Sequence, residues 1–109
     1  MLIPVKNTLS FAIADANKSC TFYENGFIKS IVLVLPNFTT ATSATQIDVI
    51  DDDSYTIYTN TTGWLENATH LITGISVPVG KAYTLKVTLN AGAGGAHDAV
   101  VKVFINTQE

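Results

Sequence analysis

The sequence predicts an all-β fold, a single antiparallel β-sandwich of about eight strands with a jelly-roll or immunoglobulin-like arrangement. Short runs rich in Val, Ile, Thr and aromatic residues recur along the chain, and turn-forming residues separate them. No segment has the apolar spacing of an amphipathic helix. A chain of 109 residues is long enough for one hydrophobic core, so we expect one domain over residues 1–109.

Residues 27–35 are predicted to form the central strand. The segment follows the turn dipeptide Asn25-Gly26 and ends at Pro36, which cannot donate to a β-ladder. Its second half, residues 31–35, is apolar at every position. A short continuous apolar run indicates a strand that is buried on both sides or covered by a neighbour. We therefore expect the centre of a sheet, and also part of a subunit contact.

The N-terminal third is predicted to contain two further strands. Residues 2–5 fit either a short strand or part of an N-terminal arm over residues 1–7. Residues 8–14 alternate between apolar and small or polar side chains, which is typical of a half-buried strand. A turn is expected at residues 15–18 and a short strand at 20–23.

A β-hairpin is predicted for residues 45–59, with strands at 45–50 and 55–59 around an acidic turn. Asp side chains favour turns because they accept hydrogen bonds from nearby backbone amides. The acidic residues also offer oxygen ligands for calcium, but the calcium-loop pattern of acidic residues and glycine is absent, so a plain hairpin is favoured. The acidic residues concerned are Asp48, Asp51, Asp52 and Asp53.

The second half is predicted to contain three strands, at residues 70–79, 82–89 and 99–106. Residues 60–69 are expected to be an irregular connection, and residues 90–98 a flexible Gly/Ala loop. In the last strand Val101, Val103 and Ile105 share one face, while Val100, Lys102 and Phe104 share the other.

Charge and composition exclude several function classes. Charged residues make up 14% and the net charge is −3, so nucleic acid is not expected as a partner. No run approaches the roughly 20 apolar residues that span a bilayer, and no membrane partner is expected. A small domain with few charges must hide apolar surface, which favours self-association. Cys20 is alone and is expected to be a buried, inert thiol.

No enzymatic activity, cofactor or metal site is predicted. His70 and His97 are the two imidazoles, too few for a zinc site with scattered ligands, and no nucleophile motif accompanies them. Residues 91–96 lack the Lys-Ser/Thr of a phosphate-binding loop, and their small side chains suit close contact with a neighbouring chain. Trp64, the single Trp, fits three roles: a cover for one end of the core, an interface anchor or a sugar platform.

Three segments resemble small structural proteins of tailed bacteriophages: residues 21–30 (TFYENGFIKS), 47–59 (IDVIDDDSYTIYT), and 75–80 (ISVPVG) running into 83–89 (YTLKVTL). Such proteins are typically encoded near the major capsid protein, and several are β-sandwich decoration proteins that trimerise on the head. The resemblance implies a virion protein of the capsid surface that assembles in the host cytoplasm. Its implied partners are the major capsid protein and further copies of the same chain, as a homotrimer.

The expected function is capsid decoration, in which buried surface at the joints between capsid subunits opposes internal pressure. The predicted contact residues are Leu2, Ile3 and Val5 of the N-terminal segment, Trp64, and the loop glycines Gly92, Gly94 and Gly95. The alternative is a carbohydrate-binding module, with Trp64 and either Tyr55 or Tyr58 stacking on a sugar.

Overall fold

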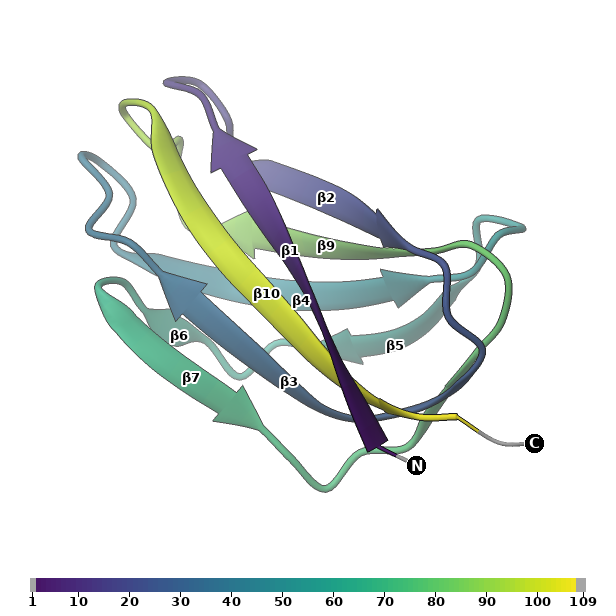
Figure 1. Cartoon of the computed structure of the whole chain (residues 1–109). Helices are drawn as coiled ribbons and strands as arrows, with labels where there is room; N and C mark the ends of the chain where they lie inside the picture. Colours follow the sequence, from purple (N-terminus) through teal and green to yellow (C-terminus); the bar gives the residue numbers. More distant parts are fainter. Residues whose placement is uncertain (1, 108–109) are drawn as a thin grey trace.

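The computed structural model describes residues 2–107, and within them it shows two five-stranded antiparallel sheets and no helix. Figure 1 shows the two sheets packed face to face. Sheet A contains β1 (Leu2–Phe11), β3 (Gly26–Leu35), β7 (Ala68–Ile72), β8 (Val77–Val79) and β10 (His97–Asn106). Sheet B contains β2 (Asn17–Phe22), β4 (Ser43–Ile50), β5 (Thr56–Asn60), β6 (Trp64–Leu65) and β9 (Tyr83–Leu89). The predicted fold class is confirmed.

The strand order is that of a jelly roll. Sheet A runs β1-β10-β3-β7 and sheet B runs β2-β9-β4-β5, while β8 pairs with β3 and β6 with β4. Early strands thus pair with late ones, β1 with β10 and β2 with β9, as in a hairpin rolled up on itself. Of the two arrangements that the sequence left open, the structure has the jelly roll.

The core lies between the sheets and is filled by alternate side chains of both. In β9, Tyr83, Leu85, Val87 and Leu89 point inward, and the residues between them face outward. In β3, the inward residues are Ile28, Ile31, Leu33 and Leu35. β3 pairs with β10 on one side and with β7 and β8 on the other, so residues 27–35 do form a central strand.

β1 is longer at its start and shorter at its end than the sequence indicated. Residues 2–7 are paired with β10, so of the two alternatives they form a strand and not a free arm. The predicted strand 8–14 was wrong beyond Phe11, because a turn begins there. The Asp15 carboxylate accepts the Ala12 N–H at 2.9 Å, and the Asp15 N–H donates to the Ala12 carbonyl at 3.1 Å.

The segment 60–79 differs most from the prediction. The expected irregular connection contains β6 and the first residues of β7. The expected continuous strand 70–79 is two strands, because the chain turns at Gly74, whose φ is +72°. β7 ends at Ile72 and β8 begins at Val77. No helix suited to crossing a membrane occurs within residues 2–107.

Candidate interaction surface

Trp64 is part of the core. Gly63, with φ of +93°, directs the chain into β6, where Trp64 pairs with Ala44 of β4. This pairing places the indole between the sheets, and only 7% of the residue is exposed. The structure therefore has the first of the three roles considered for Trp64, a cover for the core. A sugar or a partner chain would find little of the ring to contact.

The Gly/Ala loop packs closely against its own chain. Ala93 is buried; its carbonyl accepts the N–H groups of Thr39 and Thr40, each at 3.1 Å, and its N–H donates to Asp15. Gly94, with φ of +83°, donates its N–H to Ile13 at 2.9 Å. The small residues of the loop are explained by these contacts within the chain.

The N-terminal residues divide between the two faces of sheet A. Ile3 and Val5 alternate with the same face as Leu9, and Val5 packs against the core. Leu2 lies on the opposite, outer face and is 53% exposed. Of these three predicted contact residues, Leu2 is therefore the one placed to meet another molecule.

The acidic turn, which we define as residues 51–54 between β4 and β5, is built by Asp51. Its Oδ1 accepts the N–H of Asp53 at 3.0 Å and that of Tyr55 at 2.9 Å. Its backbone accepts from Ser54 and donates to Tyr55. Ser54 is left-handed, with φ of +69°. The predicted hairpin and its mechanism are confirmed, because the Asp51 carboxylate serves the turn.

Asp48 does not join the other three aspartates. It is buried on β4, where its carboxylate accepts hydrogen bonds from Gln46 Nε2 at 2.9 and 3.0 Å and from Thr59 Oγ1 at 2.8 Å. No group of three or more His, Cys, Asp or Glu side chains that could hold a metal ion occurs in the part of the chain that the structure describes. Asp48 is thus a strand residue whose carboxylate is hydrogen-bonded within the sheet, and Asp51, Asp52 and Asp53 belong to the hairpin turn.

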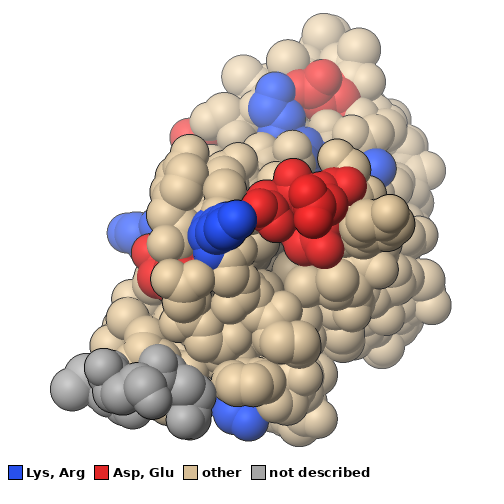
Figure 2. Space-filling view, turned by 90° about the vertical axis from the view of Figure 1, so that its right-hand side faces the viewer, with Lys and Arg blue, Asp and Glu red and all other residues tan. Residues whose placement is uncertain are grey.

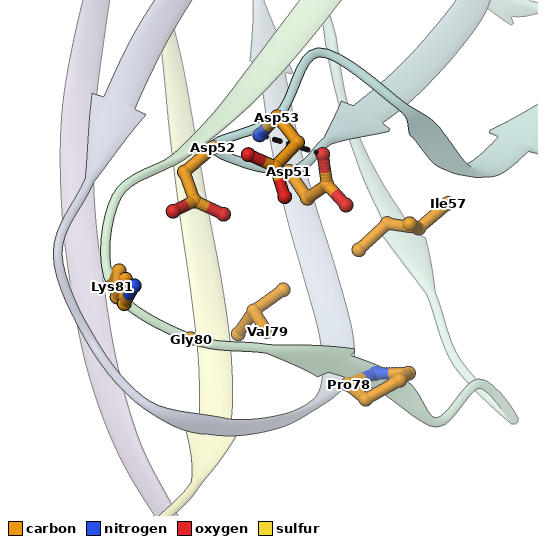
Figure 3. Close-up of a pocket in the computed structure, with 8 residues that line it drawn as sticks. All are labelled: Asp51, Asp52, Asp53, Ile57, Pro78, Val79, Gly80 and Lys81. Carbon is orange, nitrogen blue, oxygen red and sulfur yellow. Dashed lines mark hydrogen bonds between the residues drawn. The ribbon is translucent and has the colours of Figure 1, made fainter.

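An open pocket of about 430 Å³ lies beside the acidic turn. Acidic side chains gather on this side of the molecule (Figure 2). Figure 3 shows the turn on one side of the pocket and the segment from Pro78 to Lys81 on the other. Asp52 and Asp53 are exposed here, and Lys81 has no carboxylate within ion-pair distance among residues 2–107. The acidic turn is therefore accessible from solvent at one end of the sandwich, next to this pocket.

In two buried titratable groups the pKa is shifted in favour of the neutral form. Burial raises the pKa of the Cys20 thiol to about 12, which keeps it protonated and unreactive at neutral pH. Burial, with Glu24 nearby, raises the pKa of Tyr83 as well. His97 Nε2 lies 2.9 Å from Thr39 Oγ1, and His70 Nε2 lies 2.7 Å from the Leu65 carbonyl oxygen. The two imidazoles are separate and each has a local partner.

The outer face of sheet A carries an apolar surface. It is made by outward-pointing residues of five strands, and no other part of residues 2–107 forms a third layer over it. Leu71, which pairs with Val32, is 63% exposed. We call this surface the apolar face; its apolar members are Leu2, Pro4, Phe27, Val32, Val34, Leu71, Pro78, Val100 and Phe104.

The outer face of sheet B is more polar, although Leu65 of β6 is 71% exposed there. Its outward side chains are mostly hydroxyl and amide groups: Asn17, Ser19, Thr21, Gln46, Thr59, Thr84 and Thr88, with Lys86 among them. A solvated antiparallel sheet normally has such a polar outer face. The outer face of sheet A departs from that pattern, because it has more apolar outward side chains.

Sequence reasoning found part of the apolar face. The continuous apolar run in residues 31–35 suggested a subunit contact, and Val32 and Val34 are its outward members. Val100 and Phe104 share the non-core side of the last strand. What the sequence did not show is that these two sets are adjacent, since this depends on the pairing of β3 with β10.

No family model matches the sequence, and no curated protein matches it. Solved structures match the fold. A fucose-binding module of Streptococcus pneumoniae, SpX-3, matches with a TM-score of 0.58 and 13% identity, over 94% of this chain and 73% of that one. The SPBc2 prophage-derived protein YomS matches with a TM-score of 0.51 and 11% identity, over 94% of this chain and 95% of that one.

The arabinose-bound α-L-arabinofuranosidase MgGH51 matches with a TM-score of 0.53 and 13% identity, over 90% of this chain. The aligned part spans 19% of the arabinofuranosidase. At these identities the likeness is one of fold. The chain shares a small β-sandwich with these proteins, which include a prophage-derived protein and a fucose-binding module.

Proposed function

We propose that this protein is a non-catalytic structural component of a phage virion, a decoration protein that binds the capsid surface as a homo-oligomer and stabilises it. The observation that carries the proposal is the apolar face, a sheet surface that no other part of residues 2–107 covers. Burying such a face is favourable at about 25 cal/mol per Å² of apolar area, and it would hold neighbouring subunits together without any chemistry.

The size of the apolar face suits this role. Four strands at about 4.8 Å spacing and ten residues at about 3.3 Å rise give a sheet surface of about 600 Å². A stable interface buries roughly 800 Å² per partner. The face is therefore large enough to be most of one interface.

Three further observations support a virion protein. The sequence resembles phage decoration proteins over three segments. Jelly rolls are common in viral capsid domains, although a fold alone does not establish a function. The low content of charged residues, 14%, fits a chain that functions as part of an assembly.

The sugar-binding alternative has lost its main residue, because Trp64 lies in the core. Tyr58 also packs against the core, and its hydroxyl accepts a hydrogen bond from Asn60 Nδ2 at 3.0 Å. Tyr55 is exposed beside the acidic turn, but a lone Tyr provides half of the stacking pair that was expected. The apolar face therefore favours decoration over sugar binding.

Co-sedimentation with undecorated heads of the encoding phage tests the proposal. Wild-type protein should bind to saturation, and the double variant Leu2→Asp/Leu71→Asp should lose at least about tenfold in affinity. Both residues are largely exposed, so the variant should fold normally. Tyr23→Asp is the matched control, since Tyr23 is 72% exposed and lies outside the apolar face. Equal binding by all three proteins, or no binding by wild type, would contradict the proposal.

A further inference from the structure

We infer that the apolar face binds the acidic turn of a second copy of this chain, so that the oligomer is built from head-to-tail contacts. This inference rests on the proposed homo-oligomer and identifies the two surfaces that meet in it. It is carried by the charges of both surfaces and by their places on different sheets, which approach each other at Pro78, where the apolar face borders the pocket beside the acidic turn.

The apolar face carries a net positive charge: within residues 2–107 its strands point three lysines and one carboxylate, Asp98 of β10, outward. Lys6 and Lys102 are directly opposite one another in the β1–β10 ladder, and both point outward. Lys29 lies at the bulge of β3 where the register with β10 shifts. Within residues 2–107 the one ion pair is Lys18–Asp15, so none of these three lysines has a carboxylate within 4.0 Å.

Two of the three lysines lie over aromatic rings of the apolar face. Lys102 Nζ lies 5.9 Å from the centroid of the Phe104 ring, and Lys29 Nζ lies 5.6 Å from that of Phe27. Lys29 also donates to Ser76 Oγ at 2.9 Å. Ammonium groups over rings keep their remaining donors available. The face therefore offers apolar area together with cations, and the partner that fits it is apolar and acidic.

Two apolar faces packed against each other would not provide acidic groups for the lysines. Such a two-fold contact puts the same patch on both sides, so two surfaces of net positive charge would face each other. Like charges brought together in an interface cost several kcal/mol. The partner surface must therefore be a different part of the chain or a different molecule.

The acidic turn has the complementary composition. Asp52 and Asp53 are exposed. The carboxylate that accepts the backbone hydrogen bonds of the turn is that of Asp51. The turn is flanked by exposed apolar side chains, Tyr55 at 70% and Ile57. An acidic projection with an aromatic and an aliphatic neighbour matches a cationic apolar face in both charge and hydrophobicity.

The geometry makes the contact heterologous. The acidic turn joins β4 to β5 of sheet B at one end of the sandwich, while the apolar face is the broad outer side of sheet A (Figure 1). A contact between an end of one copy and a side of the next uses two different patches. Repeated, it closes into a ring when the rotation permits. This arrangement is compatible with the trimer expected from the sequence.

Charge reversal in the isolated protein tests the inference, with light scattering and sedimentation as readouts. The face variant Lys6→Glu/Lys102→Glu and the turn variant Asp52→Lys/Asp53→Lys should each weaken self-association at least about tenfold. A chain with all four substitutions should regain it, because the charges are complementary again. Lys18→Glu/Lys86→Glu, on β2 and β9 away from both surfaces, is the control for net charge and should associate like wild type.

The outcomes separate this inference from the proposed function. Monomeric wild type at every concentration, reversed variants that associate normally, or a four-substitution chain that stays monomeric would each overturn the head-to-tail contact. Co-sedimentation with capsids measures the proposed function independently. Capsid binding by a chain that fails the charge-reversal test would leave decoration standing and remove only the head-to-tail contact.

Discussion

Gly94 lies so close to Thr40 that a Cβ on Gly94 would overlap the Thr40 side chain and backbone nitrogen. This approach joins the Gly/Ala loop before β10 to the loop before β4. It is reinforced by the hydrogen bonds of Thr39 and Thr40 to Ala93. The Gly/Ala loop, which the sequence predicts to be flexible, is thus held by contacts with neighbouring loops of the same chain.

Gly94→Ala should therefore destabilise the protein by more than its backbone conformation alone requires. A left-handed residue other than glycine costs about 1–2 kcal/mol, and overpacking adds about 1–3 kcal/mol. Gly74→Ala is the matched control, because Gly74 has φ of +72° and a Cβ added there would meet no atom within 4 Å. Urea unfolding measures both. Equal losses in the free energy of unfolding would show that the contact with Thr40 is unimportant.

Trp64→Ala should lower the free energy of unfolding by about 3–5 kcal/mol, as large-to-small changes of buried aromatic residues do. Tyr55→Ala, which removes an exposed ring, should change it by less than about 0.5 kcal/mol. Urea unfolding again provides the measurement. A small effect at Trp64 would mean that the indole is outside the core in solution, and the sugar-platform alternative would regain its main residue.

Asp51→Ala should cost about 1–2 kcal/mol, because the N–H groups of Asp53 and Tyr55 lose their acceptor. Asp52→Ala should be close to neutral, since its exposed side chain does not build the turn. The two variants carry the same change in charge. Thermal unfolding compares them directly, and similar midpoints would contradict the assignment of the turn to Asp51.

These local features show what the sequence could predict. Asp51 and the β-rich runs around it define the hairpin within residues 45–59, and the apolar residues 31–35 mark the central strand by themselves. The position of Trp64 depends instead on the pairing of β6 with the distant β4, and that of residues 2–7 on β10. Alternation of apolar and polar residues carries no information about which distant strand is the partner.

The apolar face could be predicted in part for the same reason. Each strand shows which of its residues share a side, as Val100, Lys102 and Phe104 do. The register then decides that Lys6 stands opposite Lys102 and that Val32 stands beside Leu71. At Gly74 the sequence pattern predicts a strand where there is none. The alternation of apolar and polar residues continues through Gly74, but the backbone turns there.

The stability of the protein should fall as the pH rises above about 9. Burial raises the pKa of Cys20 from about 9 to about 12, so the unfolded thiol ionises first and the unfolded state is favoured between these values. Below pH 9 both states are protonated and the contribution is constant. Cys20→Ala should show a shallower decline, with Tyr83 accounting for part of what remains. Identical pH profiles for the two proteins would contradict the raised pKa.

Lys102→Glu should have opposite effects on the monomer and on the assembly. In the monomer it replaces two like charges opposite each other on β1 and β10 by an ion pair with Lys6, which stabilises by about 0.2–1 kcal/mol. In the assembly it removes a cation from the apolar face, so self-association should weaken. Urea unfolding at low protein concentration measures the first effect and light scattering the second. A purely structural lysine would move both quantities in the same direction, whereas a lysine kept for an acidic partner must move them apart.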